Sequence, residues 1–181
     1  RYHMASFSTD PRRSPAPSRR DTEITMVMRN ALEPAIFLER YPRSSIDVYA
    51  EVLEADGGTR CASIIAATVA LVDAGIPMKD LVVSCSAGKY NGKIVLDLGD
   101  YEDKNGEADV PIAYMPQLNK ITLLQMDGVL SAEELDQCIG LAIEGCKQIY
   151  EMQREALKKK YGIEKAEKEL EGEAQEEKEE E

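Results

Sequence analysis

The chain has 181 residues, a net charge of −12 and 31% charged residues, enough for one domain with a substantial core. It contains no uninterrupted apolar run of membrane-spanning length, so the sequence predicts no transmembrane helix. Its first residues, RYHM at 1–4, lack the apolar segment of a secretion signal and look like the end of a strand.

The four cysteines do not show the spacing of a zinc site or of a disulfide framework. Cys61 and Cys138 lie in apolar helical patterns, where small buried thiols are common. This cysteine usage predicts no structural metal and fits the reducing cytosol, so we expect a cytoplasmic protein.

Charge is distributed unevenly along the chain. Residues 1–20 carry five Arg and one Asp, whereas residues 163–181 carry ten Glu and three Lys. The first 18 residues are rich in Ser, Pro and Arg, so we expect no helix there. We predict a folded domain over residues 1–162 and an acidic low-complexity tail over residues 163–181.

The hydrophobic periodicity predicts three helices. One spans about 21–41 with a kink at Pro34, the second spans about 59–73, and the third runs to about 161. Ser131 and Glu134 form the capping box that opens the third helix.

Strand patterns occupy the segments between these helices, at 45–54, 80–88, 92–98, 107–115 and 120–127. Asn91-Gly92 and Asn105-Gly106 lie between such runs and predict hairpins, and Asn119 marks a further turn. The order of elements predicts an α+β fold (α/β two-layer), with helices packed on a mainly antiparallel mixed sheet.

A glycine turn, Asp56-Gly57-Gly58-Thr59-Arg60, joins the strand at 45–54 to the apolar helix that follows. The first N–H groups of a helix lack partners and attract anions. Thr59 adds a hydroxyl and Arg60 a planar guanidinium suited to phosphate. The competing interpretation is that glycine serves only the geometry of the turn.

Asp103 and Asp109 flank the turn expected at Asn105-Gly106. A two-residue hairpin loop would place them on opposite faces of the sheet, whereas a three-residue loop would make them diagonal neighbours on one face. Two carboxylates on one face suit a Mg²⁺ ion or a general acid. The competing interpretation is that Asp, Asn and Gly are ordinary turn residues.

Several short motifs, taken together and in order, resemble the RNase PH-like catalytic subunit of the archaeal exosome over roughly residues 1–161. They are FSTD at 7–10, PAPSRR at 15–20, ALEPA at 31–35, IDV at 46–48, ADGGTR at 55–60, DAGIPM at 73–78, GEADVP at 106–111, LLQMDG at 123–128 and QREAL at 153–157. The acidic tail lies outside the resemblance.

The resemblance implies an RNase PH-like fold and a phosphorolytic 3′→5′ exoribonuclease, which uses inorganic phosphate to release nucleoside diphosphates from single-stranded RNA. It implies a phosphate site at Gly58, Thr59, Arg60 and Arg20, RNA contacts from Arg19 and Arg20, and a catalytic pair, Asp103 and Asp109. Asp109 would protonate the leaving 3′ oxygen directly or through Mg²⁺ bound by the pair. Composition alone suggests that the basic leader, residues 1–18, is disordered, whereas the resemblance implies that it is an ordered part of the site.

The family fold begins with further strands before the position of Arg1, so the resemblance implies a domain that is incomplete at its N-terminus. We therefore expect an open sheet edge or an exposed apolar patch in the structure. The resemblance also implies a hetero-hexameric ring with a homologous non-catalytic subunit, RNA-binding cap proteins on one face, and no membrane partner.

Two alternatives remain at the level of sequence. One is a non-catalytic ring or scaffold subunit that only binds RNA and partners; the acidic pair and the Gly-Thr-Arg turn argue against it. The other is a stand-alone phosphorolytic enzyme that trims the 3′ ends of transfer RNA. The PAPSRR and GEADVP segments favour the exosome subunit.

Overall fold

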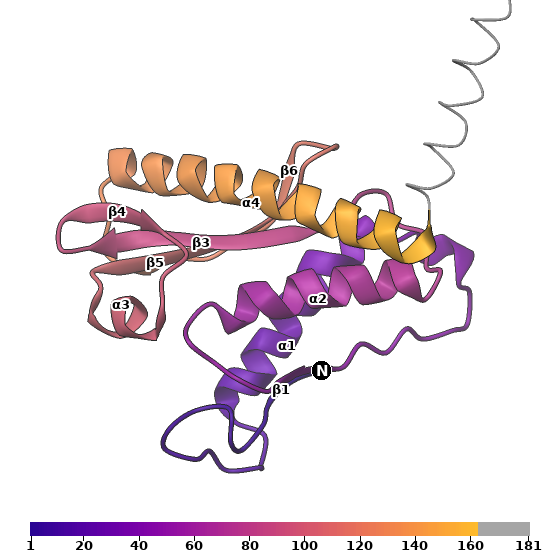
Figure 1. Ribbon diagram of the computed structural model, residues 1–181, viewed down its shortest axis with the longest axis horizontal. Coiled ribbons are helices and arrows are strands. Elements are labelled where there is room, and N and C mark those ends of the chain that lie inside the picture. The colour runs from indigo at the N-terminus through magenta and orange to yellow at the C-terminus, as the bar shows by residue number, and fades with distance from the viewer. Residues whose placement is uncertain (163–181) are drawn as a thin grey trace, which may run out of the picture.

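The computed structural model describes residues 1–162 as an α+β fold in which helices cover both faces of an antiparallel sheet. The long helix α4 (Ala132–Tyr161) lies along one face, and α1 (Arg19–Leu32) and α2 (Thr59–Asp73) lie on the other (Figure 1). No helix within residues 1–162 is long and apolar enough to cross a membrane. The acidic tail predicted at 163–181 lies outside the described residues.

The main sheet has the order β4-β3-β5-β6, and the short strand β7 also pairs with β5. Its strands are β3 (Val83–Tyr90), β4 (Lys93–Leu96), β5 (Ala108–Met115), β6 (Lys120–Leu124) and β7 (Asp127–Gly128). The pairings within it are antiparallel, in agreement with the sequence-based expectation.

The hairpin predicted at Asn91-Gly92 is confirmed. Tyr90 pairs with Lys93, and both loop residues have positive φ, 50° for Asn91 and 72° for Gly92. Positive φ at both central positions matches the twist of the flanking strands and is tolerated well by Asn and Gly.

The hairpin predicted at Asn105-Gly106 is wrong. Residues 100–105 form a short helix, α3 (Asp100–Asn105), and β4 and β5 do not pair with each other but lie on either side of β3. The parity argument for Asp103 and Asp109 therefore does not apply, because Asp103 lies on a helix rather than at the end of a strand.

The first predicted helix ends earlier than expected. Helix α1 stops at Leu32, and two 3₁₀ turns follow, η1 (Glu33–Ala35) and η2 (Leu38–Arg40). Pro34 lacks an N–H for the helical ladder and its ring clashes with the preceding turn, so it ends the helix instead of kinking it. By contrast, α2 and α4 have the predicted extents, and the capping box of Ser131 and Glu134 is present.

The strand predicted at 45–54 is reduced to β2 (Ala50–Val52), which pairs in parallel with β1 (Tyr2–Met4). Among the described residues these two strands pair only with each other, so the expected open sheet edge is present. Exposed apolar side chains lie beside it, with Tyr49 74% and Leu53 62% exposed.

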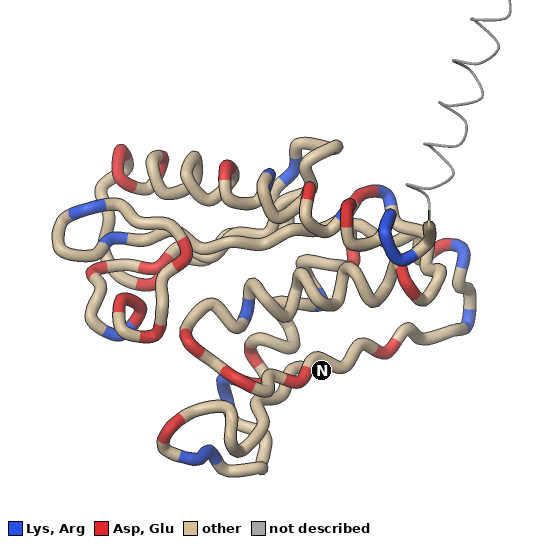
Figure 2. The backbone as a smooth tube through the Cα atoms, in the orientation of Figure 1, with Lys and Arg blue, Asp and Glu red and all other residues tan. Residues whose placement is uncertain are grey.

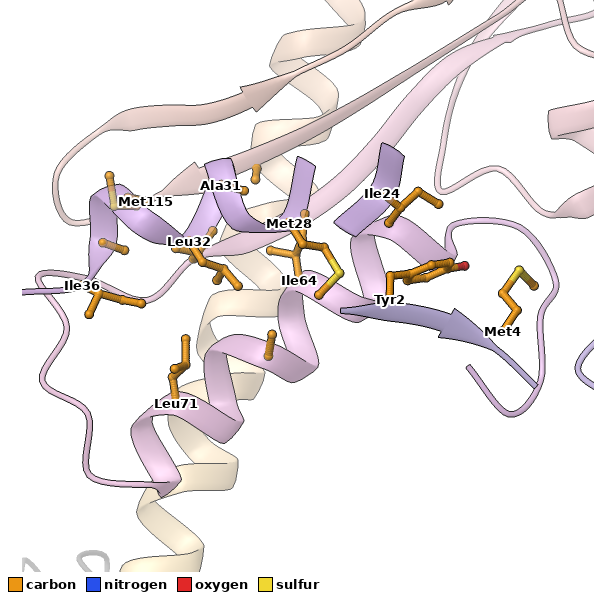
Figure 3. Close-up of a cluster of buried hydrophobic side chains, with 14 residues drawn as sticks. Tyr2, Met4, Ile24, Met28, Ala31, Leu32, Ile36, Ile64, Leu71 and Met115 are labelled. Carbon is orange, nitrogen blue, oxygen red and sulfur yellow. The ribbon is translucent and has the colours of Figure 1, made fainter. Parts of the chain in front are cut away.

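Strand parity divides the core into two clusters, one on each face of the sheet. Val83 and Cys85 face α4, whereas Val82, one residue earlier, faces the α1/α2 layer. The cluster on the α1/α2 side includes Tyr2 of β1, Ile24 of α1 and Ile64 of α2 (Figure 3). This packing fixes the N-terminal ends of both helices at one end of the sheet.

Candidate functional site

A polar cavity of about 260 Å³ lies where the N-terminal ends of α1 and α2 meet the sheet. It is lined by twelve residues: Arg20, Glu23, Gly58, Thr59, Arg60, Cys61, Ser86, Asp103, Asp109, Pro111, Gln125 and Asp127. Six of the seven residues singled out in the sequence therefore lie together. The seventh, Arg19, is exposed at the start of α1 and does not line the cavity.

The glycine turn requires glycine for steric reasons as well as for its backbone angles. Gly57 and Gly58 both have positive φ, 76° and 58°. A Cβ atom on Gly57 would lie 2.5 Å from the carbonyl oxygen of Leu98, too close for any real side chain. Asp56 Oδ1 in the same turn accepts a hydrogen bond from the Asp100 N–H, which attaches the start of α3 to the glycine turn.

The N-terminus of α2 faces the cavity without a side-chain cap. Its N-cap residue is Gly58, so no side chain accepts from the first N–H groups of the helix. Thr59 and Arg60 are the first two helical residues and both line the cavity. Free N–H groups, a hydroxyl and a guanidinium together form an arrangement suited to a tetrahedral anion.

Arg60 is held by Glu23 and retains unused hydrogen-bonding capacity. Its Nη2 atom lies 3.6 Å from Glu23 Oε1, and its side chain is only 18% exposed. Its Nε–H is buried and finds no acceptor within residues 1–162. A buried donor without a partner is costly, so its presence beside a cavity indicates a place for an acceptor.

The two aspartates reach the cavity from different elements. Asp109 lies on β5, on the face opposite to Val110 and therefore on the α1/α2 side. Asp103 projects from α3, which the glycine turn attaches to this end of the sheet. Figure 2 shows that acidic residues gather around α3 and the loops beside it.

Burial and the nearby Asp103 carboxylate raise the pKa of Asp109 from 3.8 to about 6, against the opposing effects of Arg60 and Ser86. Asp109 Oδ1 is buried and accepts no hydrogen bond from the described chain. The Asp109 carboxyl therefore exchanges its proton close to physiological pH, which suits a proton donor or acceptor.

Sequence reasoning missed four further polar residues of the cavity: Glu23, Ser86, Gln125 and Asp127. Asp127 of β7 pairs directly with Asp109 across the sheet and adds to the raised pKa of Asp109. Glu23 holds Arg60 and accepts a 3.4 Å hydrogen bond from Gln125 Nε2. A signal for Glu23 was available, because it lies three residues after Arg20 on the same face of α1.

Two other expectations can be compared with this geometry. Residues 1–18 form β1 and a loop that buries Ala5 and Ser8, but none of them lines the cavity, so the expectation that the leader forms part of the site holds only for Arg20, just beyond it. Cys61 does line the cavity and is buried as expected, as is Cys138. Burial raises the pKa of the Cys61 thiol to about 12, which makes it a poor nucleophile.

Comparison with known proteins assigns the class of this molecule. Residues 1–77 match domain 1 of the 3′ exoribonuclease family, and residues 80–145 match domain 2 of the same family. The chain therefore belongs to the 3′ exoribonuclease family.

Among its relatives are proteins named exosome complex component Rrp41. The chain is 56% identical over 161 residues to that of Nitrosopumilus maritimus, covering 89% of this chain and 66% of the relative. It is 61% identical to that of Pyrococcus furiosus, over 89% of this chain and 64% of the relative. It is 60% identical to that of Methanopyrus kandleri, over 90% of this chain and 68% of the relative. The chain thus spans about two thirds of the length of these curated relatives.

The fold is also found in a solved structure, that of rice (Oryza sativa) Rrp46. The TM-score is 0.74 at 23% identity, with 86% of this chain and 70% of the rice chain covered. This likeness supports the assignment of the α+β architecture to the RNase PH-like fold.

Proposed function

We propose that this chain carries the active site of a phosphorolytic 3′→5′ exoribonuclease, the catalytic subunit of an exosome. The observation that carries the proposal is the cavity itself. It places an uncapped helix N-terminus with Thr59 and Arg60 within one small space with Asp109, whose pKa is raised. The names of the relatives, exosome complex component Rrp41, support the same conclusion.

In the proposed reaction, inorganic phosphate occupies the N-terminus of α2, held by the free N–H groups, the hydroxyl of Thr59 and the guanidinium of Arg60. One of its oxygens attacks the phosphorus of the last phosphodiester of the RNA. The bond to the 3′ oxygen of the preceding nucleotide breaks, and that oxygen takes up a proton. The products are a nucleoside diphosphate and an RNA shorter by one nucleotide.

Asp109 is the proposed source of that proton. Its raised pKa keeps a substantial fraction protonated at mildly acidic pH, and its unpartnered Oδ1 marks the side from which a substrate oxygen would approach. Arg20, on the first turn of α1, lines the same cavity and would neutralise the phosphodiester. Arg19, exposed beside it, would contact the RNA backbone outside the cavity.

The charge balance of the cavity supports a proposed role for Mg²⁺. Arg20 and Arg60 are outnumbered by Glu23, Asp103, Asp109 and Asp127, yet the reaction brings two anions together. No group of three protein ligands suited to a metal ion exists among the described residues. Mg²⁺, however, usually binds one or two carboxylates together with substrate phosphates and water, so Asp103 and the ionised form of Asp109 fit as its proposed ligands, as the alternative to direct proton donation by Asp109. When bound, the ion would supply positive charge at the developing negative charge.

The proposed partners follow from the same assignment. They are single-stranded RNA, a homologous RNase PH-like subunit in a hetero-hexameric ring, and RNA-binding cap proteins. The open edge of the β1–β2 sheet and the exposed apolar residues beside it provide surface that further protein could cover. We place the assembly in the cytoplasm.

The test is product analysis with the full-length protein and its ring partner. Single-stranded RNA is incubated with phosphate, and with sulfate as a matched anion that cannot act as the nucleophile. We expect nucleoside diphosphates in phosphate and no turnover in sulfate. Monophosphates released equally in both buffers would refute phosphorolysis, and RNA binding without products would support the scaffold alternative.

Asp109→Ala tests the assigned proton donor in the same assay. We expect loss of at least a hundredfold in kcat with the assembly intact, in line with the contribution of a general acid. Unchanged turnover would remove this role from Asp109.

A further inference from the structure

We propose that Tyr2 is a positioning residue that directs the hydroxyl of Thr59 toward the bound phosphate. The inference rests on the proposed function and extends it to a residue outside the cavity. The Tyr2 hydroxyl donates a hydrogen bond to Thr59 Oγ1 at 2.9 Å, and this contact is buried. Thr59 lines the cavity, whereas Tyr2 does not and is only 2% exposed.

The direction of this hydrogen bond decides what Thr59 offers to a ligand. A threonine hydroxyl has one proton to donate and two lone pairs that accept. Because Tyr2 donates to one lone pair, the proton of Thr59 stays free for another acceptor. Phosphate oxygens only accept, so an anion at the helix N-terminus needs that proton. If Thr59 instead donated to Tyr2, it would turn a lone pair toward the anion.

Two features favour the productive direction. A phenol is more acidic than an aliphatic alcohol, so Tyr2 is the better donor of the pair. Thr59 is also the first residue of α2, where no preceding helical carbonyl is available to capture its proton. Within residues 1–162, no protein acceptor for the Thr59 proton is recorded, and the cavity lies beside it.

The ring of Tyr2 is held on several sides, as positioning requires. It packs in the buried cluster between α1 and α2 with Ile24 and Ile64 (Figure 3). Its backbone N–H donates to Thr25 Oγ1 of α1 at 2.9 Å. Tyr2 thus links α1, which carries Arg20, to the N-terminus of α2, which carries Thr59. A rigid link between these helices fixes the separation of their anion-binding groups.

The test uses Tyr2→Phe in the full-length protein assembled with its ring partner. The substitution keeps the ring and removes only the hydroxyl. We expect the KM for phosphate to rise roughly threefold to tenfold, while the KM for RNA stays within roughly twofold. The rise is only part of the value of a hydrogen bond to a charged ligand, because the Thr59 hydroxyl remains and loses only its fixed orientation. A structural defect alone would lower the active fraction, and so kcat, without changing the phosphate KM selectively.

Tyr114→Phe is the matched control. The Tyr114 hydroxyl also donates a part-buried hydrogen bond, at 2.7 Å to Asn119 Oδ1, but Tyr114 does not line the cavity. Its removal should leave both KM values unchanged. An equal rise in the phosphate KM for both phenylalanine variants would overturn the assignment to Tyr2.

A double-mutant cycle with Thr59→Val separates action through Thr59 from any independent effect. We expect Tyr2→Phe to have no further effect on the phosphate KM once the Thr59 hydroxyl is gone, and to keep its effect in Thr59→Ser, which retains a hydroxyl. Full additivity with Thr59→Val, or an unchanged KM in Tyr2→Phe alone, would overturn the inference. Absence of phosphate-dependent turnover in the unsubstituted assembly would instead refute the proposed function, and the inference would fall with it.

Discussion

The ionised carboxylate of Asp109, the proposed proton donor, should reduce the stability of the fold at neutral pH. Its pKa is raised from 3.8 to about 6 in the folded protein, first by burial and then by Asp103. The folded state therefore holds this proton more tightly than the unfolded state does. The resulting cost to stability is small well below about pH 4, grows as the pH rises toward 6, and is complete above that.

The magnitude follows from the shift. A change from 3.8 to about 6 corresponds to about 3 kcal/mol at 1.36 kcal/mol per pKa unit. Asp109 is only half-buried, and solvent screening reduces this figure to roughly 1–2 kcal/mol. The isosteric substitution Asp109→Asn removes the titrating group. We therefore expect the variant to be inactive but more stable than the unsubstituted protein by roughly 1–2 kcal/mol at about pH 7.5, and nearly equal to it at about pH 4.

The assay is urea unfolding of the full-length protein at both pH values, with EDTA present so that no bound cation stabilises the carboxylate. Asp136→Asn, which alters an exposed aspartate on α4, is the control and should show no such pH-dependent gain. A gain in Asp109→Asn that is the same at both pH values, or a loss of stability at neutral pH, would refute the electrostatic reasoning.

Three further predictions concern other parts of the structure. Asp80→Ala should lower the free energy of unfolding in urea by roughly 2–4 kcal/mol, because the buried carboxylate accepts three backbone hydrogen bonds. A loss below 0.5 kcal/mol, roughly the lower bound for a single hydrogen bond, would contradict this prediction. Gly57→Ala should lower the Tm much more than Gly75→Ala, since both glycines have positive φ but only the former meets neighbouring atoms, and equal losses would refute the steric argument. Glu23→Gln should lower the phosphate KM roughly twofold to fivefold by freeing the charge of Arg60, and a raised KM would show that the ion pair is needed for orientation.

Local patterns predicted those parts of the fold that local chemistry determines. The Asn91-Gly92 hairpin and the capping box at Ser131 depend only on backbone angles and on hydrogen bonds a few residues away. The candidate anion site at the glycine turn before α2 was predictable for a similar reason. Any helix that starts without a side-chain cap has unpaired N–H groups, whatever the rest of the fold.

The errors occurred where tertiary contacts override local preference. Asn105-Gly106 has the composition of a hairpin turn, but the segment before it forms α3 and attaches to the glycine turn through Asp56, more than forty residues away in the chain. Asp127 could not be assigned to the site for a similar reason. Its position depends on pairing between β7 and β5, and sequence spacing alone does not reveal strand register.

The origin of the terminal phosphate of the product tests the central claim most directly. The full-length protein with its ring partner is given unlabelled single-stranded RNA and radiolabelled orthophosphate. If phosphate at the N-terminus of α2 is the nucleophile, the label appears in the β-phosphate of every nucleoside diphosphate released, and Arg60→Ala abolishes its incorporation. RNA shortening without incorporation of label would contradict the account.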